Sequence, residues 1–203
     1  SAEDAKSEIE RGIKGGQRIY KRYGDDILKW ARGTSVDPFF ALAVMGVETG
    51  GSRRVIEGPK VSPAGAAGIG QFMPQTWAEA SRVVYGESLD PEKRFDPDVA
   101  GPVVFYYLNH LQQNGFQSLE EVAAAYNSGP GTVGHLRSGQ IDSLPGETRR
   151  YMTGVMAAKH ILEREILKDV VPPDDEPTYE PESATIEMPG DEDQLLIESM
   201  RGH

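Results

Sequence analysis

The feature that most constrains this chain is the spacing of its apolar residues, which recur every three or four positions along most of the sequence. Strand-like alternation of useful length is not found in residues 1–168. Ile9, Ile13, Tyr20, Tyr23, Ile27 and Trp30 predict one amphipathic helix, whose first half is weakened by Gly12, Gly15 and Gly16. The sequence therefore predicts a mainly α-helical domain.

Start and stop signals divide the rest of this region into further helices. Asp37 followed by Pro38 predicts a helix that runs to about Glu48. Ser118 opens a capping box, with a helix to about Tyr126. The other predicted helices cover about residues 75–85, 101–114 with Pro102 in the first turn, 130–137, and Tyr151 to Ile166 with closure at Pro172-Pro173. Residues 50–72 contain too many glycines and prolines for regular structure and predict a structured loop region, although a short hairpin there is an open alternative.

Charge separates the chain into two parts. The net charge is -11, but residues 169–203 carry eleven acidic residues against Arg201, a net of -10, and residues 1–168 are close to neutral. Because neither part has the basic stripe that phosphate-backbone binding needs, nucleic acid is not expected as a partner. No apolar run is long enough to form a transmembrane segment. The sequence has no cysteine, and its four histidines lack metal-ligand spacing, so no metal or organic cofactor is expected.

The expected organisation is an N-terminal helical extension over residues 1–23, a catalytic domain over 24–168, and an acidic, proline-containing tail over 169–203. The composition of the tail is typical of disorder. A docking or autoinhibitory role for it, on this chain or on a protein partner, is an open alternative.

Glu48 is the strongest candidate for chemistry. It ends the apolar stretch that begins at Pro38, so it lies at the C-terminal end of a helix predicted to be buried. Loss of water and the negative pole of the helix both favour the protonated carboxyl and raise its pKa. A proton donor of this kind is what cleavage of a glycosidic bond requires. A solvated glutamate at a frayed helix end is the alternative reading of this segment alone.

Four separated segments carry a family resemblance. They are Glu48-Thr49, Ser62 to Pro74 (SPAGAAGIGQFMP), Ala124 to Gly131 (AAYNSGPG) and Leu144 to Tyr151 (LPGETRRY). Together, and with Tyr107-Leu108 between the second and third, they resemble the catalytic domain of the soluble lytic transglycosylases. The resemblance covers about residues 24–165 and implies a lysozyme-like helical fold akin to goose-type lysozyme, with the glycine-rich loop beside the active-site groove.

The resemblance implies that Glu48 is catalytic and that the substrate-binding residues are Thr49, Ser62, Gln71, Met73, Tyr126, Asn127, Glu147 and Tyr151. Some of these have simpler readings. Gln71 suits an N-acetyl or hydroxyl group but equally a loop-stabilising amide. Met73 and Tyr126 could be core residues. Glu147 could be only a helix-start carboxylate.

The sequence also departs from the family pattern. Thr49 replaces the usual serine, and Gly50-Gly51-Ser52 replaces a small-aromatic-asparagine run. Gly70 stands where a bulky residue is common, and Ala100 near a frequent asparagine. None of these changes removes a group on which the chemistry depends.

The implied reaction cleaves the β-1,4 bond between N-acetylmuramic acid and N-acetylglucosamine in the glycan strands of peptidoglycan. Glu48 would act first as acid and then as base, leaving a 1,6-anhydro end. A hydrolytic muramidase on the same fold and a non-catalytic wall-binding or structural component of a secretion or phage entry apparatus are the alternatives. The implied location is the periplasm or cell envelope for a bacterial protein, and the virion or the host periplasm for a phage protein.

Overall fold

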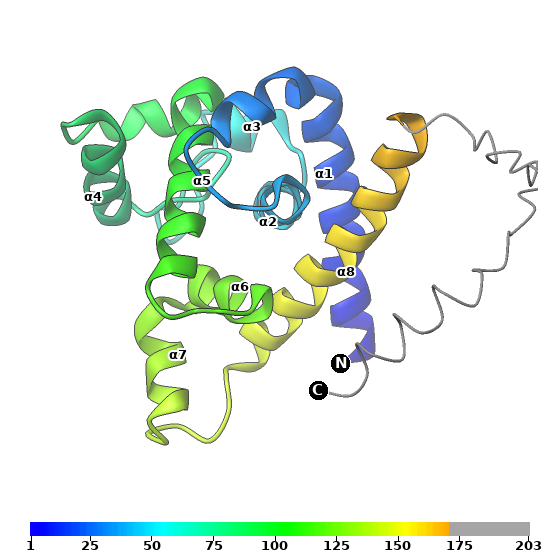
Figure 1. The fold of residues 1–203 in the computed structure, drawn as a ribbon, viewed down its shortest axis with the longest axis vertical. Coiled ribbons are helices and arrows are strands. Elements are labelled where there is room, and N and C mark those ends of the chain that lie inside the picture. Colours follow the sequence, from blue (N-terminus) through cyan, green and yellow to red (C-terminus); the bar gives the residue numbers. More distant parts are fainter. Residues whose placement is uncertain (171–203) are drawn as a thin grey trace, which may run out of the picture. The chain divides into compact units, whose positions relative to one another are not determined.

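The computed structural model describes residues 1–170, which form eight α-helices and one 3-10 helix (Figure 1). In chain order these are α1 (Ala2–Trp30), α2 (Pro38–Thr49), α3 (Arg53–Ile56), α4 (Pro74–Tyr85), η1 (Pro91–Phe95), α5 (Pro97–Gln113), α6 (Leu119–Ser128), α7 (Pro130–Arg137) and α8 (Gly146–Val170). Over this range there is no strand, and one isolated bridge joins Ala67 to Phe72. The predicted mainly α fold is confirmed. The acidic tail, apart from residues 169 and 170, lies outside the described residues.

Helix α2 forms the centre of the core. Its residues from Phe40 to Val47 are all buried, so the helix is covered by protein on every side. Asp37 caps its start by accepting a hydrogen bond from the backbone N–H of Phe39, with Pro38 at the first position. Gly50 ends it in the left-handed conformation. Both boundaries agree with the sequence prediction to within one residue.

Helix α1 crosses α2 at a point where glycine faces glycine. A Cβ atom added to Gly15 would lie 2.3 Å from the carbonyl oxygen of Gly46, and one added to Gly46 would lie 2.5 Å from that of Gly12. A larger residue at either position would force the helices apart. These glycines lower the intrinsic helix propensity of α1, but α1 is continuous because they permit close packing on α2.

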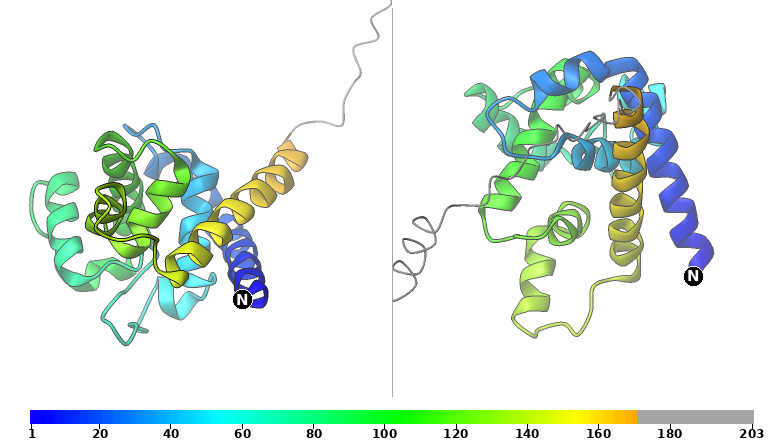
Figure 2. Two further views of the ribbon diagram at one scale, coloured as in Figure 1. Left: turned by 90° about the horizontal axis from the view of Figure 1, so that it is seen from below. Right: turned by 45° about the vertical axis from the view of Figure 1, so that its right-hand side comes forward.

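Helix α8 runs beside the first half of α1, as the separate views of Figures 1 and 2 show. A Cβ atom added to Gly12 would lie 2.8 Å from that of Ala158, and one added to Gly16 would lie 2.4 Å from a methyl group of Leu162. The buried side chains of Tyr151, Val155 and Leu162 join the core from this helix. The first turns of α8 are thereby held close to the C-terminal end of α2.

Several boundaries differ from the predictions. The loop region 50–72 contains the one-turn helix α3, and η1 was not predicted. Helix α5 begins at Pro97, because the Asp96 side chain caps it, so Pro102 lies in the second turn and not the first. Helix α6 extends to Ser128, and α8 begins at Gly146. In residues 1–170 no helix is long and apolar enough to cross a membrane.

Candidate active site

A cleft of about 500 Å³ collects most of the predicted site residues. Its walls come from the end of α2, the glycine-rich loop, the start of α4, the middle of α5, the end of α6 and the start of α8. The lining residues are Glu48, Ala64, Ala66, Gly70, Gln71, Phe72, Met73, Thr76, Tyr107, Tyr126, Asn127, Ser128, Gly129 and Glu147. Six of the nine predicted residues are among them, although they come from four separate parts of the chain.

Glu48 combines access to the cleft with a strongly perturbed carboxyl group. Its side chain is only partly exposed, and the loss of water raises its pKa from 4.5 to about 8. The positive charge of Arg11 opposes this shift, and the negative charges of Glu8 and Glu147 reinforce it. A substantial fraction of Glu48 is therefore protonated at neutral pH, as the position of this residue in the sequence predicts.

Arg11 ties the C-terminal end of α2 to helix α1. Its Nε donates to the carbonyl oxygen of Val47 at 2.6 Å, and its Nη2 donates to that of Glu48 at 3.2 Å. These carbonyls belong to the last turn of α2, where no intrahelical partner is available. Arg11 thus fixes the backbone of Glu48 and places a positive charge near its carboxyl group.

Tyr151 lies beside Glu48 behind the cleft wall. Its side chain is buried, and its hydroxyl has no hydrogen-bond partner that meets normal geometry within residues 1–170. Burial, followed by the negative charge of Glu48, raises the pKa of Tyr151 well above its usual value. Proximity to this O–H group lowers the pKa of Glu48. The hydroxyl is therefore available to donate to Glu48 once that carboxyl group has lost its proton.

Three aromatic rings, those of Phe72, Tyr107 and Tyr126, form another part of the cleft wall. The Tyr126 ring lies 5.6 Å from that of Tyr107 and 6.2 Å from that of Phe72, both tilted or edge-on. The Tyr126 hydroxyl donates to the carbonyl oxygen of Gly70 at 2.5 Å and joins α6 to the glycine-rich loop. Burial raises the pKa of Tyr126 well above its usual value, with the Glu48 charge as the second cause. Tyr126 is therefore both a packing residue and a neighbour of Glu48.

The glycine-rich loop is held in shape by a buried arginine. Arg94 donates to the carbonyl oxygens of Gly65 at 2.8 Å and Phe72 at 2.7 Å. Gly68 has a φ of +76°, and an added Cβ there would lie 1.8 Å from the Arg94 carbonyl oxygen. Gly70 does not adopt a positive φ. Its lack of a side chain makes room for the Phe72 ring instead.

Gln71 is the non-glycine residue with positive φ, at +49°, in the described part of the chain. Its side-chain Nε2 donates to the carbonyl oxygen of Gly68 at 2.9 Å, so the loop-stabilising role is real. The residue also lines the cleft. A backbone conformation of this kind costs on the order of 1 kcal/mol or more and is concentrated at functional sites.

Three predicted residues do not line the cleft. Thr49 is buried, donates to the carbonyl oxygen of Met45 at 2.7 Å and accepts from the N–H of Gly51 at 3.0 Å. Ser62 accepts a hydrogen bond from the N–H of Ala66 within the loop. Tyr151 interacts with Glu48 but does not itself line the cleft. For Thr49 and Ser62 the structure thus gives a local structural role, and substrate binding by them stays a prediction.

Sequence reasoning missed Arg11, Glu8, Arg94 and Thr76. Arg11 and Arg94 act through hydrogen bonds, and Glu8 through its charge, on residues 22 to 40 positions away, and nothing in their own surroundings signals this. Thr76 follows Pro74 at the start of α4, and only the fold turns it toward the cleft. Within residues 1–170 no group of three His, Asp or Glu side chains could hold a metal ion.

A helical domain with a protonated glutamate in a cleft of aromatic and amide side chains has the architecture of the lysozyme-like proteins. The family comparison makes this more specific: residues 25–142 match the family model described as the transglycosylase SLT domain. Since the match spans more than half of the chain, the protein belongs to this family.

Solved structures agree with this assignment. The crystal structure of the 70-kDa soluble lytic transglycosylase from Escherichia coli superimposes with a TM-score of 0.62 at 26% identity, covering 71% of this chain and 24% of that one. A complex of the 70-kDa soluble lytic transglycosylase with bulgecin A superimposes with the same TM-score of 0.62 at 25% identity, and the match covers the same shares of the two chains. The protein thus spans about a quarter of the length of these structures. A comparison with curated proteins found no match.

Proposed function

We propose that this protein is a peptidoglycan lytic transglycosylase that uses Glu48 as acid and then as base. The observation that carries the proposal is the Glu48 carboxyl group, which opens to the cleft with a pKa raised to about 8. Membership in the SLT family and the likeness to a soluble lytic transglycosylase support the same activity. The proposed catalytic unit is the domain predicted over residues 24–168, supported by Arg11 from the preceding part of α1.

In the first step, protonated Glu48 donates to the glycosidic oxygen between N-acetylmuramic acid and N-acetylglucosamine, and the bond to the anomeric carbon breaks. The 2-acetamido oxygen of the substrate stabilises the positive charge that develops there. Glu48, now a carboxylate, then removes the proton from the C6 hydroxyl of the muramic acid, whose oxygen closes the 1,6-anhydro ring. Because the carboxylate is poorly solvated, it regains a proton readily.

The other cleft residues have supporting roles. The strained backbone of Gln71 directs its amide, and Asn127 offers a second amide for the N-acetyl or hydroxyl groups of the sugars. Met73, which is 41% exposed, packs against a sugar face. The hydroxyl of Tyr151 stabilises the Glu48 carboxylate between the two steps. Such an enzyme acts where it meets the cell wall, in the periplasm or envelope or from a phage particle.

Hydrolysis is the competing reaction, because Glu147 places a second carboxylate in the same cleft that could activate water. Mass spectrometry of muropeptides from digested sacculi separates the two. We expect anhydro ends, which are lighter than hydrolytic ends by one water. Hydrated ends would make the protein a muramidase, and binding to sacculi without cleavage would make it a wall-binding module.

A further inference from the structure

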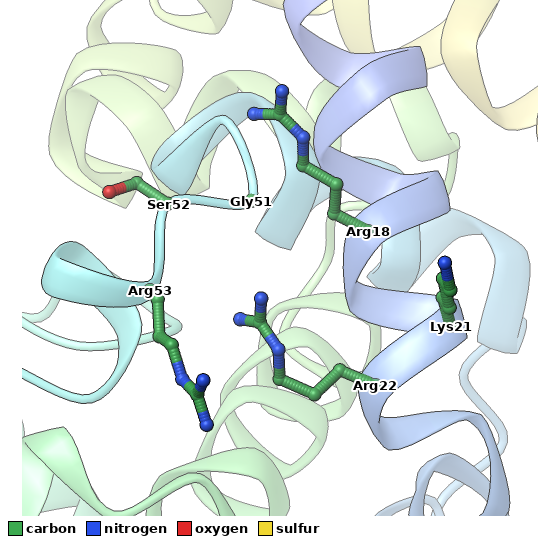
Figure 3. A pocket seen from close by; sticks show the side chains of 6 residues that line it. All are labelled: Arg18, Lys21, Arg22, Gly51, Ser52 and Arg53. Atoms are coloured by element: carbon green, nitrogen blue, oxygen red, sulfur yellow. The ribbon is translucent and has the colours of Figure 1, made fainter.

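A second cavity, of about 610 Å³, lies between the second half of α1 and the turn that follows α2. It is lined by Arg18, Lys21, Arg22, Gly51, Ser52 and Arg53. Figure 3 shows the side chains of Arg18 and Arg22 extending from α1 toward the segment that carries Gly51, Ser52 and Arg53. We call this cavity the arginine pocket.

The turn after α2 is built to approach α1. Gly51 has a φ of +71°, and an added Cβ there would lie 2.7 Å from the Cβ of Arg18. This is the stretch where Gly50-Gly51-Ser52 departs from the family pattern. Arg18 and Arg22 also precede the family match, which begins at residue 25. Arg18 and Arg22 thus lie before the stretch that matches the family model, and the turn that faces them departs from the family pattern.

The positive charge of the pocket is only partly compensated. Arg18 donates to the carbonyl oxygen of Gly50 at 3.1 Å, and Arg53 pairs with Glu57 at 2.9 Å. Arg22, whose guanidinium lies 5.8 Å from the Tyr23 ring, forms no ion pair within residues 1–170. Each guanidinium has five N–H donors, so most of the donors in this cavity are available to a ligand with several acceptor oxygens.

The pocket lies on the same edge of α1 as the contact to Glu48. Arg11, Arg18 and Arg22 are spaced by seven and four residues and share one face of the helix. Arg11 binds the backbone of Glu48, and the rise of 1.5 Å per residue puts Arg18 about 10 Å and Arg22 about 16 Å further along. Three to five extended peptide residues span this distance.

We propose that the arginine pocket binds carboxylate groups of the peptide stems attached to the glycan strand that is cleaved, an inference that rests on the proposed function. The guanidinium fork suits carboxylates, and stem peptides carry several of them beside the muramic acid at which Glu48 would act. The pocket thereby gives this protein a preference for strands that keep their peptides.

The test compares three wall substrates: peptide-bearing strands, the same strands with their carboxylates amidated, and strands stripped of peptides by an amidase. The wild-type protein and Arg22→Gln/Arg53→Gln are assayed on each, with Lys14→Gln as the control for the loss of a charge from an exposed site on α1. Because the pocket arginines are exposed, we expect a moderate effect, a three- to tenfold rise in KM on peptide-bearing strands. On amidated and stripped strands the double variant should match the wild type, and Lys14→Gln should match it on all three.

The proposal would be overturned if the double variant lost activity equally on all three substrates. It would also be overturned if the double variant kept full activity on peptide-bearing strands. A wild-type protein that does not distinguish amidated from native strands would overturn it as well. If the wild type cleaves no substrate, the proposed function fails, but the pocket is still tested by titrating the protein with soluble muropeptides in native and amidated form. Equal binding of the two forms would then overturn it.

Discussion

Glu48 and Glu57 lie nine residues apart, yet the fold drives their pKa values in opposite directions. Glu48 is crowded by protein, and desolvation raises its pKa to about 8. Glu57 accepts hydrogen bonds from the Tyr23 hydroxyl at 2.5 Å and from Arg53 at 2.9 Å, and these lower its pKa. The difference shows that loss of water around one carboxyl group, and hydrogen-bond donors aimed at the other, select which glutamate can carry a proton at neutral pH.

Both glutamates depend on helix α1, but in different ways. Arg11 on α1 donates to the backbone at Glu48 and leaves the carboxyl group unpaired. Tyr23 on the same helix donates directly to the carboxylate of Glu57, and burial together with this bond raises the pKa of Tyr23 to about 12. One helix thus supports the carboxyl group proposed as the acid and base and stabilises another that is held by hydrogen bonds.

The largest expected effect comes from removing the proton carrier. Glu48→Gln should lower the rate of wall lysis by about 10²–10⁴-fold, because the amide can neither donate the proton nor take one back. Glu57→Gln, its matched control, should keep most of the activity. The measurement is loss of turbidity of purified sacculi. Equal losses of activity in Glu48→Gln and Glu57→Gln would contradict the assignment of proton transfer to Glu48.

The same variant tests the sign of the Glu48 shift. A carboxyl group whose pKa is raised from 4.5 to about 8 on folding stabilises the fold below pH 4.5 relative to alkaline pH, and this stabilisation is lost as pH rises to about 8. Compared with wild type, Glu48→Gln should therefore gain stability over this window and be at least as stable above it. Urea unfolding at pH 5, 7 and 9 measures this gain, and a constant difference would contradict the shift.

An intermediate effect is expected from Arg11. Wall cleavage should fall as pH rises through the pKa of Glu48, because the acid form is needed for the first step. Arg11→Gln removes a charge that lowers this pKa, so the falling limb of the pH profile should move upward by up to about one pH unit. Arg11→Lys keeps the charge and should keep the limb in place. A downward shift in Arg11→Gln would contradict the electrostatic role.

The smallest effect is expected at Glu57. Tyr23→Phe removes one hydrogen bond to its carboxylate and should cost about 1 kcal/mol of unfolding free energy at pH 7. Since the folded state lowers the pKa of Glu57 below 4.5, this contribution is present above that pH and is lost in acid. Urea unfolding of both proteins at pH 7 and pH 3 should therefore show a difference that shrinks at pH 3.

Local patterns predicted much of this fold. The helix starts at Asp37-Pro38 and at Ser118 and the helix over residues 130–137 follow from nearest-neighbour chemistry, and the structure confirms them. At Ser118 only half of the predicted capping box forms: the Ser118 side chain accepts from the Glu121 N–H, but the Glu121 side chain does not accept from the Ser118 N–H. The early start of α5 was also available from Asp96-Pro97 but was missed. Among the site residues, family motifs brought Glu48, Gln71, Tyr126 and Asn127 together, and the cleft contains all four.

The sequence by itself determined that the protein is helical and that a glutamate ends its most apolar helix, because periodicity and caps act over a few residues. Only the tertiary structure decided how strongly that glutamate holds its proton, which arginine supports it, and that three other arginines meet around one cavity. These properties depend on α1 and α2 crossing where Gly15 faces Gly46. That contact joins residues more than thirty positions apart, and no local pattern specifies it.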